Sequence, residues 1–338
     1  MKTTYWWAVG FIMLTACSDK VAEPDVNGSA VDTPAASLNA RVRRAARVTI
    51  SRRSDTDLKQ KTAALLRLFP AGSTLLDADV DAASDGEVDT VLGASRLPGI
   101  RVDHENKSDT FRIADIELAN VRDGVAISEE AARQRFEAVM RSAFAAGIVK
   151  EKDYPPSDAS MTRLMQGEGN SSGAPPVESV KEYRFFVPRK VDGIVLNDGG
   201  QRDLGMKVSI HRSGALRDIQ LSAAGATVEF GGAVTANVDE RELDERVEKD
   251  FPSSTIQPLG LRYSLNHPNG EPRQTYRVSL RSIIDGEVTN ARAKTVYYSV
   301  SDPSLPPEVW PTPNPDERSD QLRPPESGRP GSSGTVVE

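Results

Sequence analysis

The stretch LGMKVSIHRSGALRDIQL (residues 204–221) decides the fold class, because it has the pattern of two strands joined by a tight turn. Apolar and polar residues alternate on both sides of His211-Arg212-Ser213-Gly214, as a sheet that is covered on one face requires. The Ser and Gly of this tetrapeptide favour a hairpin turn. The sequence therefore predicts an antiparallel hairpin with strands over 204–211 and 216–221.

Further strand signals lie on both sides of this hairpin. They share alternating apolar and polar residues or β-branched and aromatic runs, and they cover residues 111–118, 183–187, 227–230, 260–265, 275–284 and 293–300. The dipeptides Asn269-Gly270 and Asp285-Gly286 are typical of turns between neighbouring strands. The predicted sheets are therefore antiparallel.

Helices are predicted where a polar cap precedes apolar residues at helical spacing and Gly or Pro follows. The caps and stops are Asp55 or Asp57 with Pro70, Ser128 with Gly147, and Asp239 with Pro252. Acidic residues directly after Ser128 favour the positive end of a helix dipole. Helices and strands together predict an α+β fold in which helices pack on antiparallel sheets.

Composition divides the chain into successive segments. They are a signal peptide over 1–16, a flexible tether over 17–45, a smaller α/β region over 46–150, a linker over 151–178, an antiparallel α+β domain over 179–301, and a disordered Pro-rich tail over 302–338. We expect residues 177–303 to fold alone and Trp310 of the tail to dock on the fold. The alternative is that strand 111–118 shares a sheet with the later strands, with the linker only a surface loop.

The first residues have the layout of an export signal. Lys2 is followed by an apolar run from Tyr5 to Leu14, which is shorter than the roughly 20 residues needed to span a bilayer as a helix. Leu14-Thr15-Ala16-Cys17 then resembles the bacterial lipobox, which implies that Cys17 becomes the mature N-terminus and carries diacylglycerol. The alternatives are an ordinary secretory signal and an uncleaved membrane anchor.

A lipid on Cys17 also fits the cysteine count. Cys17 is the only cysteine, so an exported chain could form no internal disulfide, and lipidation removes the liability of a free thiol. The resemblance implies a bacterial cell envelope location with the lipid bilayer as a partner. Ser18 in place of Asp matches the outer-membrane sorting pattern of Gram-negative lipoproteins.

A second resemblance concerns the strand-rich part of the chain. It is carried by Tyr183-Arg184-Phe185-Phe186-Val187, Val191-Asp192-Gly193-Ile194, Met206-Lys207-Val208-Ser209-Ile210 and the turn Ser213-Gly214. The segment is similar to the PepSY and related sensor-lipoprotein families, in which a helix packs across a small antiparallel sheet. The resemblance covers about a third of the chain and implies a non-enzymatic binding or peptidase-restraining module.

The charge distribution argues against nucleic-acid binding. The formal net charge is −7, and basic residues are mixed with acids along the folded part. Basic residues gather once, behind the tether, at Arg41, Arg43, Arg44, Arg47, Arg52 and Arg53. This cluster could contact anionic lipid headgroups or lipopolysaccharide, and a solvated arm or strand edge is the favoured interpretation.

The nearest approach to a metal site is the acidic series Asp77, Asp79, Asp81 and Asp85. Alternating carboxylates can converge on calcium, but Ala82 and Val88 stand where a calcium loop has its turn Gly and its closing Glu. We expect a solvated acidic loop with weak calcium affinity and no bound cofactor.

Two other patterns bear on function: a serine motif typical of hydrolases, and three histidines that could serve as metal ligands. Gly169-Asn170-Ser171-Ser172-Gly173 matches the nucleophile-elbow spacing, but Pro175-Pro176 follows and Ser171 falls in the predicted linker. His104, His211 and His267 are far apart in sequence and have polar or turn-like neighbours, so surface positions are expected.

The sequence favours a non-catalytic envelope lipoprotein that binds a protein or peptide partner. A hydrolase or metal-dependent enzyme with an unrecognised site and a structural or surface-coating lipoprotein remain as alternatives. A deep pocket with clustered titratable groups would favour the enzyme, and an exposed groove or sheet edge would favour the binding module.

Overall fold

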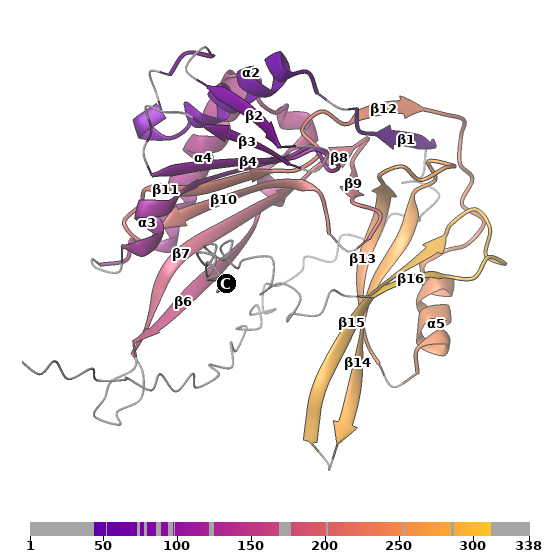
Figure 1. Cartoon of the computed structure of the whole chain (residues 1–338). Helices are drawn as coiled ribbons and strands as arrows, with labels where there is room; N and C mark the ends of the chain where they lie inside the picture. Colours follow the sequence, from indigo (N-terminus) through magenta and orange to yellow (C-terminus); the bar gives the residue numbers. More distant parts are fainter. Residues whose placement is uncertain are drawn as a thin grey trace, which may run out of the picture. The chain divides into compact units, whose positions relative to one another are not determined.

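The structure is a computed structural model that describes residues 44–311 except 52, 73–74, 78–79, 86–88, 94–96, 98, 122–124, 169–176, 201, 253 and 285–286. It is a mixed helix and sheet fold whose sheets are mainly antiparallel, as predicted (Figure 1). Among the helices of this described part, none is both long and apolar enough to cross a membrane.

The larger sheet has eight strands. In spatial order they are β2 (Asp81–Asp85), β3 (Asp89–Gly93), β4 (Ile100–Glu105), β5 (Thr110–Asp115), β11 (Leu216–Leu221), β10 (Gly205–His211), β7 (Val177–Pro188) and β6 (Ser160–Glu168). The predicted hairpin forms β10 and β11, with Val208 opposite Ile219. Their alternating apolar side chains are buried, which places this pair at the centre of the sheet.

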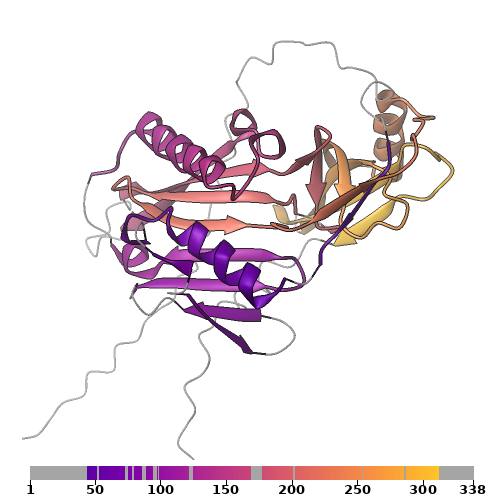
Figure 2. The same ribbon diagram turned by 90° about the horizontal axis from the view of Figure 1, so that it is seen from above.

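Two helices contribute to the same buried apolar cluster as these strands. They are α2 (Asp55–Leu66) and α4 (Glu129–Ala145), and Figure 2 shows both in front of the strands of the larger sheet. The ring of Phe136 in α4 stacks on Phe185 of β7 with centroids 4.5 Å apart. Leu65 of α2 is fully buried in this cluster.

A second sheet of six strands has its own buried cluster. Its order is β16 (Glu308–Pro311), β15 (Glu287–Ser299), β14 (Arg273–Ile284), β13 (Thr255–Ser264), β9 (Ile194–Asn197) and β8 (Lys190–Val191). Helix α5 (Glu240–Asp250) supplies Leu243 and Val247 to this cluster. The phenol of Tyr276 donates to Asp244 of the helix at 2.8 Å, which satisfies a buried polar group.

The remaining elements are short. They are the strand pair β1 (Ala46–Thr49) and β12 (Thr227–Phe230), the helix α3 (Ile116–Asn120), and the single turns of 3₁₀ helix at Pro70–Gly72, Glu151–Asp153 and Pro156–Asp158.

The predicted division at residues 151–178 is wrong as a boundary between sheets. Strand β5 from the first predicted region pairs with β11 from the second, and Ile113 lies opposite Ile219. Residues 160–168 of the predicted linker form β6. Local composition could not predict the pairing of β5 with β11, because this pairing buries apolar side chains that are about a hundred positions apart. The Pro and Gly residues of the predicted linker indicate only a local preference for turns.

Three local predictions also need correction. Strand 111–118 ends at Asp115, because the Asp115 carboxylate accepts from the Leu118 N–H at 2.8 Å and caps α3. Ser54 caps α2 in place of Asp55 or Asp57. Residues 308–311 of the predicted disordered tail form β16, in which Trp310 lies opposite Thr295 and is 44% exposed.

Candidate functional site

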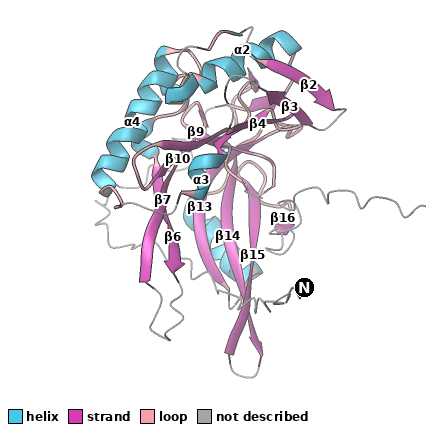
Figure 3. Cartoon of the chain, turned by 60° about the vertical axis from the view of Figure 1, so that its left-hand side comes forward, coloured by secondary structure: helices cyan, strands magenta, loops and turns pink. Residues whose placement is uncertain are grey.

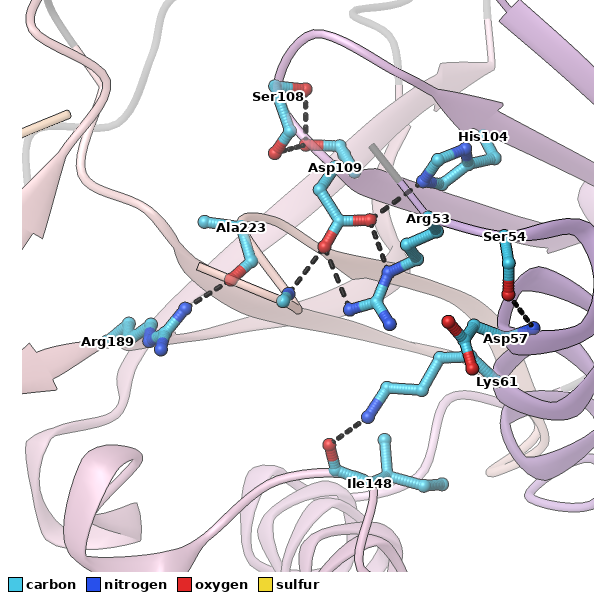
Figure 4. Close-up of polar contacts among 12 residues, drawn as sticks. Arg53, Ser54, Asp57, Lys61, His104, Ser108, Asp109, Ile148, Arg189 and Ala223 are labelled. Atoms are coloured by element: carbon cyan, nitrogen blue, oxygen red, sulfur yellow. Dashed lines mark hydrogen bonds and ion pairs between the residues drawn. The ribbon is translucent and has the colours of Figure 1, made fainter. Parts of the chain in front are cut away.

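A buried cluster of charged and polar groups surrounds Asp109, in the turn between β4 and β5. The carboxylate accepts from Arg53 Nε at 2.7 Å and Nη2 at 2.9 Å, and from His104 Nε2 at 2.9 Å (Figure 4). It also accepts from the Gly225 N–H. We call Asp109, Arg53, His104 and Gly225 the Asp109 cluster.

Local backbone geometry positions this cluster. Asp109 has φ of 44°, in the left-handed region that Asp and Asn tolerate better than most residues. A Cβ on Gly225 would lie 2.4 Å from Arg53 Nη2, so only glycine lets the backbone approach the ion pair. Strand pairing sets His104 opposite Phe111, and the two rings pack with centroids 4.4 Å apart.

The Asp109 carboxylate is ionised throughout the physiological range. Burial alone would raise its pKa, but hydrogen bonds from His104, Arg53 and Gly225 and the charge of Arg53 lower the pKa to about 2. His104 therefore donates through Nε2, and its buried Nδ1 has no partner among the described residues. Arg53 and Asp109 form a bidentate ion pair. This ion pair and the Gly225 N–H connect three separate segments of the chain: the residues before α2, the β4–β5 turn and the segment after β11.

A pocket of about 310 Å³ lies beside this cluster. We call it the Lys61 pocket, and it is lined by Arg53, Asp57, Gln60, Lys61, Ala64, Ala146, Gly147 and Ile148. Lys61 Nζ donates to the Ile148 carbonyl oxygen (Figure 4). Burial and the charge of Arg53 lower the pKa of Lys61 to about 8.

The predicted surface positions of the histidines are wrong for two of the three. His104 is 1% exposed and His211 is 0% exposed, while His267 is half-buried. His211 Nδ1 lies 2.8 Å from Ser213 Oγ, and its Nε2 lies 3.2 Å from the Val121 carbonyl oxygen. His104 packs on Phe111 of the paired strand, and His211 contacts the Val121 carbonyl from 90 positions away, contacts that their sequence neighbours do not reveal.

The other predicted site residues do not come together in the described chain. Asp77 pairs with Arg67 at 2.5 Å, and Asp81 and Asp85 begin and end β2, so the acidic series is partly a strand instead of a loop. Asp79, Ser171 and Cys17 lie outside the described residues. Within the described ranges, no group of three or more His, Cys, Asp or Glu residues could hold a metal ion.

The predicted basic cluster is divided among different contacts. Arg53 belongs to the Asp109 cluster, and Arg44 lies over the Phe230 ring at 3.6 Å. Arg47 is exposed on β1, and Arg41, Arg43 and Arg52 lie outside the described residues. From the sequence, no role was predicted for Asp109 or Lys61. The one local signal near Asp109 was the strand predicted from residue 111 onward.

A second candidate feature is the edge of the larger sheet at β6. Among the described strands β6 pairs only with β7, and it extends over nine residues. Met165 is 40% exposed, and Arg163 forms an ion pair with Glu129 of α4 at 3.0 Å. Figure 3 shows β6 and β7 side by side.

Comparison with known proteins gives the fold alone. No protein-family model matches the chain, and no curated protein matches its sequence. A solved structure, an uncharacterized protein from Eubacterium rectale ATCC 33656, is similar with a TM-score of 0.50 and 10% sequence identity. The similarity covers 80% of this chain and 86% of that one, so the two chains are similar in fold over most of their lengths.

Proposed function

We propose that this chain is a lipid-anchored protein of the bacterial cell envelope, without catalytic activity, whose folded part binds an extended segment of a protein or peptide partner. The partner segment adds a strand to β6. The observation that supports this proposal is that β6 lies at the end of an eight-stranded sheet and pairs with only one of the described strands, β7. An edge strand offers unpaired N–H and C=O groups, which supply affinity in strand addition.

The other edge strands of the eight-stranded and six-stranded sheets are shorter than β6. β2 has five residues and an aspartate at each end, β16 has four residues and ends at Pro311, and β8 has two residues. Short strands, charges and proline are the usual protections of a sheet edge against pairing. β6 has nine residues without proline, and its side chains from Ser160 to Gln166 are exposed or half-buried.

The side chains of β6 also indicate what its partner resembles. In the β6–β7 register, Met161 lies opposite Phe185 and Arg163 opposite Tyr183, so both are on the face of the sheet that holds the apolar cluster. An added strand would therefore place alternate side chains beside Met161 and beside the Arg163–Glu129 ion pair. We expect a segment that carries one apolar and one polar side chain two positions apart.

Photocrosslinking tests strand addition directly. A photoreactive amino acid at Thr162, exposed on β6, should crosslink a defined envelope partner in intact cells, whereas the same amino acid at Glu248, exposed on α5, should not. Adding Met165→Lys should reduce the Thr162 crosslink at least about fivefold, because a charge on an edge strand opposes pairing. Equal crosslinking from both positions, or an unchanged yield with Met165→Lys, would contradict the proposal.

The lipid anchor has a separate test. Cells expressing the wild-type chain should incorporate radiolabelled palmitate into it, and the Cys17→Ser variant should incorporate none, since Cys17 is the only cysteine. The variant should also be recovered without detergent. If Cys17→Ser protein carries as much label as the wild type, the anchor is elsewhere or absent.

A further inference from the structure

Two cationic side chains beside α2, Lys61 and Arg189, have no carboxylate among their hydrogen-bond partners in the described part of the chain. Lys61 interacts electrostatically with Arg53, Arg189 and Asp109, and Asp109 is the only acid of these four groups. Arg53 is neutralised by Asp109, whereas the partners of Lys61 and Arg189 among the described residues are carbonyl oxygens. Arg189 is 9% exposed, and its buried Nε has no partner among the described residues. Cations held away from water without an acidic partner are costly, so this region favours an added anion.

Two of these three cationic groups open onto the same pocket, and Arg189 does not line it. Arg53 and Lys61 both line the Lys61 pocket, together with the amide-bearing Gln60. Arg53 uses Nε and Nη2 for Asp109, and among the described residues its Nη1 has no hydrogen-bond partner. Figure 4 shows the Arg53 guanidinium and the Lys61 ammonium on the same side of Asp109, with the Ile148 carbonyl beyond Lys61. Two cationic donors on one pocket wall are the arrangement that binds oxyanions.

We propose that the Lys61 pocket binds a phosphate group, with Arg53 Nη1, Lys61 Nζ and the Gln60 side chain as donors. Phosphate fits better than a carboxylate, since its oxygens point in several directions and can serve donors that approach from separate side chains. The pocket volume of about 310 Å³ exceeds what a phosphate group fills, so a substituted phosphate such as a phosphomonoester also fits.

Negative groups around the pocket define where the phosphate binds. Asp57 also lines the pocket, but it is exposed and forms no ion pair with Arg53 or Lys61. The C-terminal end of α4, at Ala145, carries the negative end of the helix dipole, and Lys61 faces the segment that follows it. The phosphate is therefore expected between Arg53 and Lys61, on the side away from Ile148.

The test is titration of the purified full chain with inorganic phosphate, followed by backbone NMR and isothermal calorimetry. Chloride at equal ionic strength is the control. Phosphate should shift the amide signals of Gln60, Lys61, Gly147 and Ile148, and chloride should not. Lys61→Met should weaken binding at least about tenfold, while Lys61→Arg should stay within about threefold of the wild type. Lys59→Met, on the same helix but outside the pocket lining, should bind like the wild type.

Each outcome decides the proposal. Phosphate affinity that is unchanged in Lys61→Met, or equal signal changes with chloride, would overturn it. If Lys61→Met loses its fold, which its unfolding curve would show, Gln60→Ala supplies the test. Gln60 is exposed and is a donor of the proposed site, so this variant should fold and bind phosphate more weakly, and an unchanged affinity would overturn the proposal. Vesicles of phosphatidylglycerol distinguish the source of the phosphate. If the vesicles shift the same amide signals and free phosphate competes with them, the ligand is a lipid headgroup. If free phosphate alone shifts the signals, the ligand is a soluble phosphate.

Discussion

We expect the free energy of unfolding of the Asp109→Asn variant to be about 3–5 kcal/mol lower than that of the wild type. This is the usual cost of removing one partner from a buried ion pair. The Asp109 side chain is 2% exposed and holds Arg53, His104 and the Gly225 N–H. Asparagine tolerates the φ of 44° at this position, so the backbone contributes little to the loss. The loss measures the uncompensated Arg53 charge and the hydrogen bonds to His104 and Gly225.

Urea unfolding at neutral pH measures this effect, and Asp103→Asn is the matched control. Asp103 lies in the adjacent strand and pairs with Arg101 at 2.9 Å, but its side chain is 30% exposed. An exposed pair of this kind contributes about 0–1 kcal/mol. If the two variants lose similar free energy, the Asp109 cluster is not a structural ion pair.

The same variant has a defined pH dependence. The pKa of Asp109 is lowered from 3.8 to about 2 by folding. The ionised Asp109 carboxylate therefore makes its full contribution to the free energy of unfolding above pH 3.8. This contribution is lost as the pH falls through about 2. As the pH is lowered from 3.8 to about 2, the difference in free energy of unfolding between the wild type and Asp109→Asn should decrease by about 2 kcal/mol. A difference that stays constant down to pH 2 would contradict the ionised Asp109.

Residues 177–303 expressed alone should lose cooperative unfolding entirely, which is the largest effect we expect. Without residues before 177, β11 loses its partner β5, and the buried Ile219 and Leu221 lose the strand beside them. Phe185 loses the Phe136 ring of α4, and β12 loses β1. The whole free energy of unfolding, typically about 5–15 kcal/mol for a domain, should be absent.

Circular dichroism in urea and gel filtration test this expectation, with residues 44–311 as the control. The control should be monomeric or of defined size and unfold in one transition, and the short segment should aggregate or give no transition. A soluble short segment with a cooperative transition would instead support the division at residues 151–178.

The local features of the fold were predictable because their physical causes are local. The hairpin over 204–221 became β10 and β11, since its alternation and its turn lie within one continuous stretch. The helices near Ser128 and Asp239 began at these caps, because a cap is a hydrogen bond to an N–H three residues on. The similar pattern at residues 111–118 failed because Asp115 is itself a cap.

The candidate sites were beyond local prediction, as the Asp109 cluster shows. Asp109 meets Arg53 from 56 positions away and Gly225 from 116 positions away. From the sequence, Arg53 was grouped with the basic residues that follow the predicted tether, and His104 was predicted to lie on the surface. Nothing in the neighbours of either residue indicates this contact, because an ion pair forms wherever folding brings opposite charges together.

The sequence by itself determined the periods of the strands, the caps of the helices and the mainly antiparallel class of the sheets. Only the tertiary structure decided that β5 pairs with β11, that β6 ends the sheet, and that Lys61 and Arg53 share a pocket. The physical reason is that alternation specifies which face of a strand is buried but not which strand lies beside it. The choice of partner depends on apolar surface contributed by distant segments at once, here by Phe136, Phe185 and Ile113.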